Sequence, residues 1–216
     1  MTFKDSFITY EAFGATGDGV TDDLPSICGA HEYANEHGFP VRTKPDATYH
    51  LGTRALTAVI ATDTDWNTSR FTITDDTQVE DHKAHLFVVR LQLEPEELQI
   101  DRLTRDQKQV DARPARDCHV LVENDNRRLY IRRGLNQNKG VPQHDCFVLR
   151  RDGSVASPID WDYDVVTRVE ARPIDDTPLV LRGGIFTTFA NCMEQEVGYN
   201  YWARNIVISR SNTEVD

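Results

Sequence analysis

The stretch FGATGDGVTDDLPSICGAHEYANEHG, residues 13–38, places a glycine-rich acidic turn directly before a short predicted helix. A glycine-rich loop that opens a helix can bind a phosphate, because its backbone N–H groups and the helix N-terminus both favour anions. This stretch lacks both the Lys-Ser/Thr pair of a P-loop and the G-x-G-x-x-G spacing, and Asp18, Asp22 and Asp23 would repel a phosphate. We therefore interpret it as a capping turn rather than a phosphate site.

The residues after the turn predict a short helix with one narrow apolar stripe. Thr21 or Asp22 is its expected N-cap, acids and Pro25 are expected in its first turn, and Gly38 ends it. The stripe consists of three apolar residues at helical spacing, with one aromatic residue beside it: Ile27, Ala30, Ala34 and Tyr33. Such a helix must bury its stripe, so we expect it to cover another part of the chain.

The composition limits the class of protein. The chain has 216 residues, of which 39% are hydrophobic and 27% charged, enough for one large or two small domains with an adequate core. Its formal net charge of −11 disfavours nucleic acids and anionic membrane surfaces as partners, because both need concentrated positive charge. We therefore expect neither of these partners, and the charge itself identifies no substrate.

The termini and cysteines indicate the compartment. The N-terminal residues MTFKDSFITYEAF contain no apolar run long enough for a secretory signal, and no stretch approaches transmembrane length. Four scattered cysteines without a C-x-x-C pair predict reduced thiols rather than a disulfide frame or a zinc site: Cys28, Cys118, Cys146 and Cys192. We expect a cytoplasmic protein without a bound metal. Secretion is the alternative, if a signal peptide has been removed.

Short β-branched or apolar segments separated by turns follow the helix. They occupy residues 41–43, 48–51, 55–61 and 71–74. Because no second helical pattern separates them, they indicate stacked β structure rather than βαβ units.

The N-terminal part of the chain resembles the pectate-lyase-like right-handed parallel β-helix superfamily, whose members include polygalacturonases, pectate-lyase-type proteins and phage tailspikes. The resemblance rests on four elements in order: Phe13-Gly14-Ala15, then Gly17-Asp18-Gly19-Val20-Thr21-Asp22-Asp23, the predicted helix, and a strand ending in Tyr49-His50-Leu51. It implies that the turn and helix close the N-terminal end of a solenoid, as repeat folds require. The expected fold is therefore an all-β parallel β-helix with a capping helix. The motif is specific for the fold and weak for function.

The middle of the chain predicts a small antiparallel β domain inserted into the solenoid. One hairpin is expected to turn at Asp125-Asn126 and another, of type I′, at Asp152-Gly153, and residues 165–171 alternate as a further strand. The coils of a parallel solenoid contain no two-residue hairpins. The expected domains are residues 1–89 with the cap and first coils, 90–177 with the insertion, and 178–216 with the resumed coils.

The resumed coils end without a second cap, where the family's chains run into the next coil. A solenoid with few coils and one uncapped end is marginally stable on nearest-neighbour grounds. We therefore expect a truncated front part of a longer protein, with self-association into a homo-oligomer through the uncapped end as one consequence.

The resemblance implies a carbohydrate-active protein whose partner is an oligo- or polysaccharide. The full-length protein is expected to be a glycoside hydrolase or a polysaccharide lyase, and no cofactor is expected unless a lyase uses calcium. A non-catalytic carbohydrate-binding or tailspike-like assembly module is the alternative. The polygalacturonase motifs N-T-D, D-D, H-G and R-I-K do not occur here in order, so the catalytic residues stay unassigned and we expect no turnover from these 216 residues.

Substrate-binding candidates lie in two aromatic stretches. As a strand, Asp160-Trp161-Asp162-Tyr163-Asp164 would place three carboxylates on one face and two rings on the other. This is either a sugar or cation site or, as we favour, a solvated edge over packed rings, since it lacks the glycine and distal glutamate of a calcium loop. Residues 199–204 either stack on sugars and pair with a uronate or pack on the solenoid wall. The candidates are Asp160, Trp161, Asp162, Asp164, Tyr199, Tyr201, Trp202 and Arg204.

Two further groups of residues lie in the predicted insertion. Arg127-Arg128 and Arg132-Arg133 precede the amide-rich stretch GLNQNKGVPQHD, residues 134–145. Its amides suit the recognition of hydroxyl groups, but we favour an ordinary hairpin with a polar loop. His144-Asp145 has the composition of a base and its orienting acid, but the sequence places no Ser or Cys nucleophile beside it.

Overall fold

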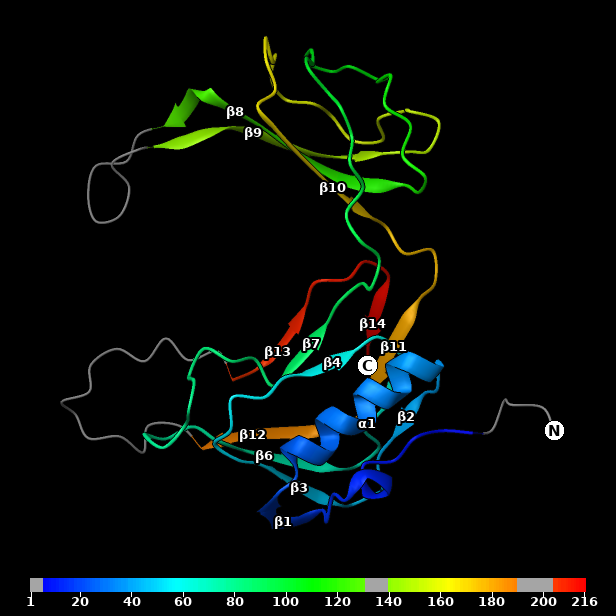
Figure 1. The fold of residues 1–216 in the computed structure, drawn as a ribbon, viewed down its shortest axis with the longest axis vertical. Coiled ribbons are helices and arrows are strands. Elements are labelled where there is room, and N and C mark those ends of the chain that lie inside the picture. Colours follow the sequence, from blue (N-terminus) through cyan, green and yellow to red (C-terminus); the bar gives the residue numbers. More distant parts are fainter. Residues whose placement is uncertain (1–5, 131–139, 190–203) are drawn as a thin grey trace. The chain divides into compact units, whose positions relative to one another are not determined.

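The computed structural model describes residues 6–130, 140–189 and 204–216, and the chain divides into two compact units (Figure 1). The first unit contains Met1–Gln92 and Asp175–Asp216, and we call it the solenoid unit. The second contains Leu93–Ile174, and we call it the antiparallel unit. Neither of the helices in the described residues is long and apolar enough to cross a membrane.

Three parallel sheets, here called A, B and C, form the solenoid unit. Sheet A contains β2 (Val41–Arg42), β5 (Thr64–Asp65), β11 (Leu179–Arg182) and β14 (Thr213–Val215). Sheet B contains β1 (Asp18–Asp22), β3 (Thr48–Leu51), β6 (Arg70–Thr74) and β12 (Ile185–Phe189). Sheet C contains β4 (Ala58–Ile60), β7 (Phe87–Val89) and β13 (Ile206–Ile208).

The chain visits the three sheets in a fixed order. The strands β2, β3 and β4 add one strand to each sheet in turn, then β5, β6 and β7 do so, and then β11, β12 and β13 (Figure 1). Each set of three is one coil, and each coil pairs in parallel with the coil before it. The predicted stacked, parallel β-helix is therefore confirmed.

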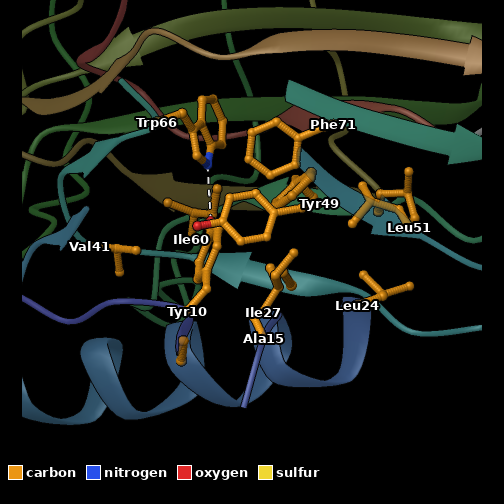
Figure 2. Close-up of a cluster of buried hydrophobic side chains, with 14 of the residues drawn as sticks. Tyr10, Ala15, Leu24, Ile27, Val41, Tyr49, Leu51, Ile60, Trp66 and Phe71 are labelled. Carbon is orange, nitrogen blue, oxygen red and sulfur yellow. Dashed lines mark hydrogen bonds between the residues drawn. The ribbon is translucent and has the colours of Figure 1, made fainter. Parts of the chain in front are cut away.

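Parallel pairing in register places equivalent side chains of successive coils on top of one another. In sheet B, Tyr49 pairs with Phe71 and Phe71 with Phe186. The ring centroids of Phe71 and Phe186 are 4.6 Å apart and the rings are almost parallel, at 9°. Trp66 contacts Phe71 edge-on, with centroids 6.0 Å apart, and Figure 2 shows these rings meeting Tyr49 in the core. This stack of buried aromatic surface holds the coils together.

The helix α1 (Leu24–His37) takes the place that a sheet C strand would have in a preceding coil. Ile8 bridges to β2 in sheet A, and β1 pairs with β3 in sheet B, so α1 faces β4. The Asn35 amide donates to the Val59 carbonyl at 2.7 Å and accepts from the Ala61 N–H at 2.9 Å. One side chain thus satisfies both backbone groups that a neighbouring strand would have paired. The predicted capping helix is confirmed.

The start of α1 differs from the prediction. Its N-cap is Asp23, whose side chain makes no capping bond, and no acid lies in the first turn. Asp22 Oδ1 accepts the Leu24 N–H at 3.2 Å and also the Gly52 N–H at 2.9 Å. The prediction of Thr21 or Asp22 as the N-cap, with acids in the first turn, was therefore wrong. Asp22 lies before the helix and instead connects its first residue to Gly52, at the corner of the first coil. The C-terminus is as predicted, since Gly38 is left-handed with φ 70°.

The acids of the glycine-rich turn bind the turn itself. Asp18 Oδ1 accepts the N–H groups of Thr21 and Val20, both at 2.8 Å, and these bonds lower the pKa of Asp18 to about 2. The Asp23 carboxylate is buried and accepts the N–H groups of Thr16 at 2.7 Å and Gly17 at 3.2 Å. The turn before the helix is thus a structural loop closed by its own carboxylates.

The predicted apolar stripe of α1 is buried, and it includes a histidine that the periodicity did not indicate. Ile27, Ala30 and Ala34 are fully buried, as are Leu24 and His31. His31 Nε2 lies 2.9 Å from the Tyr10 hydroxyl, which also accepts the Trp66 indole N–H at 3.0 Å. Figure 2 shows the Trp66 to Tyr10 bond crossing the core. Burial lowers the pKa of His31 to about 3, so this histidine is neutral in the folded protein.

The antiparallel unit has one three-stranded sheet and its own core, as predicted. Its strands, in sheet order, are β10 (Arg168–Pro173), β8 (Cys118–Tyr130) and β9 (Val141–Leu149), and both pairings are antiparallel (Figure 1). The buried side chains are Ile100, Leu103, Val110, Cys118, Val120, Val122, Phe147, Leu149, Val155, Ile159, Tyr163 and Ala171. The unit enters the chain between β7 and β11, and so between two complete coils.

Its two predicted hairpin turns fare differently. β8 continues through Asp125-Asn126, with a shift of its register against β9 between Asn124 and Arg128, so the prediction of a hairpin turn there was wrong. The Arg150–Ser154 turn exists, closed by Gly153 N–H to Arg150 O at 2.8 Å and Arg150 N–H to Ser154 O at 2.9 Å. Among its three loop residues only Gly153 has a positive φ, at 77°. Because a type I′ turn needs two such residues, the turn is instead a type I turn followed by a left-handed glycine.

Candidate functional site

The structure divides the sequence-predicted site residues between the two units. Asp160, Trp161, Asp162 and Asp164 lie together in the antiparallel unit, in residues 160–164, which we call the Trp161 loop. Arg204 lies in the solenoid unit. The remaining three, Tyr199, Tyr201 and Trp202, fall outside the described residues.

The Trp161 loop is not the alternating strand that its sequence predicts. Only Tyr163 forms a β-bridge, with Leu103, and Tyr163 is buried whereas the Trp161 side chain is 47% exposed. The two rings therefore do not share a face, and that prediction was wrong. The reason is that the N–H groups of Asp160 and Trp161 bind a side chain instead of a neighbouring strand.

That side chain is Asp145, on β9. Its Oδ2 atom accepts the Asp160 N–H at 3.2 Å, the Trp161 N–H at 3.3 Å and the Tyr163 hydroxyl at 3.2 Å. Asp145 is buried, and this burial raises the pKa of its carboxyl group above the ordinary value. Its sequence neighbour His144 instead has Nδ1 3.0 Å from the Pro142 carbonyl, so no base-and-orienter pair forms.

Two buried amides extend this polar contact across the sheet. Asn124 on β8 lies opposite Gln143 on β9, with Asn124 Nδ2 3.5 Å from Gln143 Oε1. Asn124 Nδ2 also donates to Asp164 Oδ1 at 3.2 Å, and Gln143 Nε2 donates to the Asp162 carbonyl at 3.1 Å. Sequence reasoning missed Asn124, and it considered Gln143 only as one of the amides of residues 134–145. A signal was present, because the inward alternation of Val120 and Val122 continues into Asn124.

The outward side of the loop is exposed and carries charge of both signs. Asp160, Trp161, Asp162 and Asp164 are all exposed. Asp162 Oδ1 accepts the Arg105 N–H at 2.8 Å, and Asp164 Oδ2 lies 3.3 Å from Arg127 Nη2. Within the described ranges, no group of three or more His, Cys, Asp or Glu side chains is arranged to hold a metal ion. The loop thus presents one half-exposed indole among carboxylates and a guanidinium, and its backbone is held by hydrogen bonds to the buried Asp145.

Arg204 has a different environment. Its side chain is buried, and its guanidinium donates to the backbone carbonyls of Gly52 and, at 3.4 Å, Arg54. Burial lowers the pKa of Arg204, and the nearby Asp75 carboxylate opposes that shift. The guanidinium thus ties the start of the last described segment to the corner of the first coil.

A separate concavity of about 500 Å³ lies beside α1 in the solenoid unit. It is lined by Cys28, Glu32, Asn35, Glu36, Thr57, Val59, Arg90 and Gln92. Its helix side carries two carboxylates one turn apart, but Asn35 is already committed to β4. None of the sequence-predicted site residues lines it.

The comparisons with known proteins show a similarity to solved structures only. No protein-family model matches the chain, and no curated protein matches it. Among solved structures, it is similar to one described as the crystal structure of the Pseudomonas phage phi297 tailspike gp61, with 11% sequence identity and a TM-score of 0.49. The match covers 85% of this chain and 34% of that one, so this chain spans about a third of the length of that structure.

Proposed function

We propose that this chain is a non-catalytic, carbohydrate-binding part of a β-helix protein of the pectate-lyase-like type, and that its antiparallel unit binds an oligo- or polysaccharide on the Trp161 loop. The observation that carries the proposal is the half-exposed Trp161 indole on a loop whose backbone is fixed by Asp145. An aromatic side chain held in this way offers a flat apolar face at little entropic cost on binding.

The polar groups around the indole suit the edges of a sugar. The Asp160, Asp162 and Asp164 carboxylates can accept hydrogen bonds from hydroxyl groups, and the Arg127 guanidinium can donate to a hydroxyl or a uronate carboxylate. Ligand sites commonly combine an apolar surface with a few fixed polar groups in this way.

The same geometry favours binding over hydrolysis. A glycosidase needs one carboxylic acid with a raised pKa that can reach the leaving oxygen, and a second carboxylate across the sugar. Beside the Trp161 loop, the carboxyl group with a raised pKa is Asp145, which is buried and whose Oδ2 already accepts three hydrogen bonds. Burial also raises the pKa of Asp75, but that residue belongs to the solenoid unit. A glycoside hydrolase or polysaccharide lyase activity of a longer protein remains the competing function.

The proposal is tested by titrating the chain with a panel of neutral and acidic oligosaccharides in a calorimeter. We expect binding that Trp161→Ala weakens roughly tenfold, because the loss of the stacking surface is on the order of one kcal/mol or more. Tyr130→Ala is the matched control, since Tyr130 is also an exposed aromatic residue of this unit, at 54%. It should bind as the unchanged chain does.

Two outcomes contradict the proposal. One is the absence of binding to every saccharide tried, and the other is binding that Trp161→Ala leaves unchanged. Release of reducing ends or of unsaturated uronates, lost on substitution of Asp160, Asp162 or Asp164, would instead establish the competing enzymatic function.

A further inference from the structure

Asp145 is a buried carboxylate that makes its contacts with the Trp161 loop through one oxygen. Oδ2 accepts two consecutive backbone N–H groups, of Asp160 and Trp161, together with the Tyr163 hydroxyl, at 3.2 to 3.3 Å. Hydrogen bonds to an ionised acceptor are roughly twice as strong as those between neutral groups. The charge on Asp145 therefore contributes directly to holding this loop.

At Asp160 and Trp161 the loop backbone is held by the Asp145 carboxylate. Residues 160 and 161 belong to no strand, so their N–H groups take part in no sheet ladder. The other contacts of the loop begin at Asp162, whose carbonyl accepts from Gln143 and whose carboxylate accepts the Arg105 N–H. Tyr163 then bridges to Leu103, and Asp164 binds Asn124 and Arg127. The bond from the Trp161 N–H to Asp145 is thus the contact nearest to the indole, and it fixes the backbone from which the indole projects.

We infer that Asp145 is the positioning residue of the saccharide site, and that the Trp161 loop keeps its binding geometry only while Asp145 is ionised. The inference rests on the proposed function for its consequence, but the coupling of Asp145 to the loop exists with or without a saccharide. Protonation places a hydrogen on a group surrounded by donors and removes the charge that strengthens all three bonds. Acid should therefore loosen the loop.

The groups around Asp145 indicate that it takes up its proton at a higher pH than an ordinary aspartate does. Burial raises the pKa of Asp145, the loop's three bonds lower it, and the negative charge of Asp160 raises it further. On β9 its neighbours are His144 and Cys146, and the residue opposite on β8 is Val122. Next to Val122 on β8 is Glu123, which lies opposite His144 and pairs with Arg168 of β10 at 3.1 Å.

The first experiment needs no saccharide. The backbone amide resonances of Asp160 and Trp161 are followed by NMR from neutral to acidic pH in the whole chain. We expect both to shift with one common midpoint above about 3.9, the ordinary aspartate value. Asp145→Asn should abolish that shared transition, whereas Asp152→Asn, in the hairpin turn of the same unit, should leave it unchanged. Independent midpoints, or a transition that survives in Asp145→Asn, would overturn the inference.

A second variant keeps the test decisive if Asp145→Asn does not fold. Tyr163→Phe retains the carboxylate and removes one donor to it. Because a hydrogen bond to the charged form lowers a pKa, its loss should move the shared midpoint upward. A midpoint that stays in place would contradict the assignment of the transition to Asp145.

The final measurement is saccharide affinity as a function of pH. The unchanged chain should lose affinity as the pH falls through the NMR midpoint. Asp145→Asn should bind roughly tenfold more weakly than the unchanged chain at neutral pH, and its affinity should change little with pH. A chain that binds no saccharide but shows the expected amide transition contradicts the proposed function alone. Binding that is equally strong in Asp145→Asn and independent of pH contradicts the positioning role alone.

Discussion

The two units of this chain bury polar side chains for different purposes. In the solenoid unit, Asn35 pairs with the edge of β4, and His31, Tyr10 and Trp66 form a chain of contacts inside the core. In the antiparallel unit, Asn124, Gln143 and Asp145 reach from the sheet to an exposed loop. Polar burial thus completes a repeating core in one unit and shapes a surface in the other.

This difference predicts which substitutions should destabilise the fold and which should change ligand recognition alone. A solenoid is stabilised by contacts between neighbouring coils, so a defect at its capped end affects every coil that stacks on it. The Trp161 side chain is half exposed at the surface of the antiparallel unit, so its loss should alter recognition and leave the fold intact. The following predictions test that contrast, beginning with the largest expected effect.

The largest effect is expected from Ile27→Asp. Ile27 is fully buried in the stripe that faces the coils, so the substitution buries an unpaired carboxylate and should cost about 3–5 kcal/mol or more, enough to unfold the solenoid unit. Tyr33→Asp is the control, because Tyr33 on the same helix is 39% exposed. Thermal unfolding by circular dichroism measures both. An unchanged melting curve for Ile27→Asp would mean that the helix is peripheral.

The next effect concerns acid stability. Burial lowers the pKa of His31 to about 3 in the folded state, against about 6.5 when unfolded, so the unfolded state binds the proton more readily. The effect of neutral His31 on stability is complete above about pH 6.5 and is lost progressively as the pH falls toward 3, by up to roughly 5 kcal/mol.

Urea titrations at pH 7 and pH 4 test this contribution. His31→Gln keeps a hydrogen-bonding group near Tyr10 and removes the titration, so it should lose less stability between the two pH values than the unchanged chain. Equal losses in the two proteins would show that His31 does not drive the pH dependence.

A smaller effect is expected from Asn35→Ala. It leaves the Val59 carbonyl and the Ala61 N–H without their side-chain partner and should cost about 1–3 kcal/mol in the free energy of unfolding. When it is protonated, Asn35→Asp keeps an acceptor for the Ala61 N–H and an O–H donor for the Val59 carbonyl, so at acidic pH its cost should be smaller than that of Asn35→Ala. Urea denaturation ranks the free energies of unfolding of the unchanged chain and the two variants. Equal stability of all three would contradict the interpretation that Asn35 takes the place of a neighbouring strand.

The smallest effect on stability is expected from Trp161→Ala. Its side chain is half exposed, so the free energy of unfolding should change by about 0.5 kcal/mol or less. Measuring unfolding and saccharide affinity on the same sample separates the two quantities. A large loss of stability would mean that Trp161 supports the core of its unit. It would contradict the contrast between a stabilising solenoid and a surface loop that serves recognition.

The sequence predicted those features that repeat or that use local turn chemistry. The spacing of Ile27, Ala30 and Ala34 indicated the buried face of the helix, and Gly38 its end. The all-β parallel solenoid with an inserted antiparallel sheet was predicted from the resemblance and the hairpin patterns. Such features depend on residues that are close in the chain, so they can be predicted from the local sequence pattern.

Features that depend on distant partners were missed. Asp125-Asn126 has the composition of a turn, but Asp125 N–H bonds to Thr167 Oγ1 at 3.0 Å, from a segment 42 residues away, and the strand continues. Likewise, composition drew attention to the Trp161 loop, whereas Asp145 and the two amides that fix it come from other strands. Nothing in the local pattern of residues 160–164 specifies which side chain will bind their N–H groups.

The place where the antiparallel unit enters the chain has a consequence for how such proteins can diversify. The coils before and after it stack as consecutive coils, with Leu181 of β11 beside Thr64 of β5 and Val207 of β13 beside Val88 of β7. The scaffold therefore accommodates an insertion of 82 residues, Leu93–Ile174, without a break in its repeat. A cassette held in this way can be exchanged or redesigned for another ligand while the supporting coils keep their sequence, so recognition and support can evolve at separate rates.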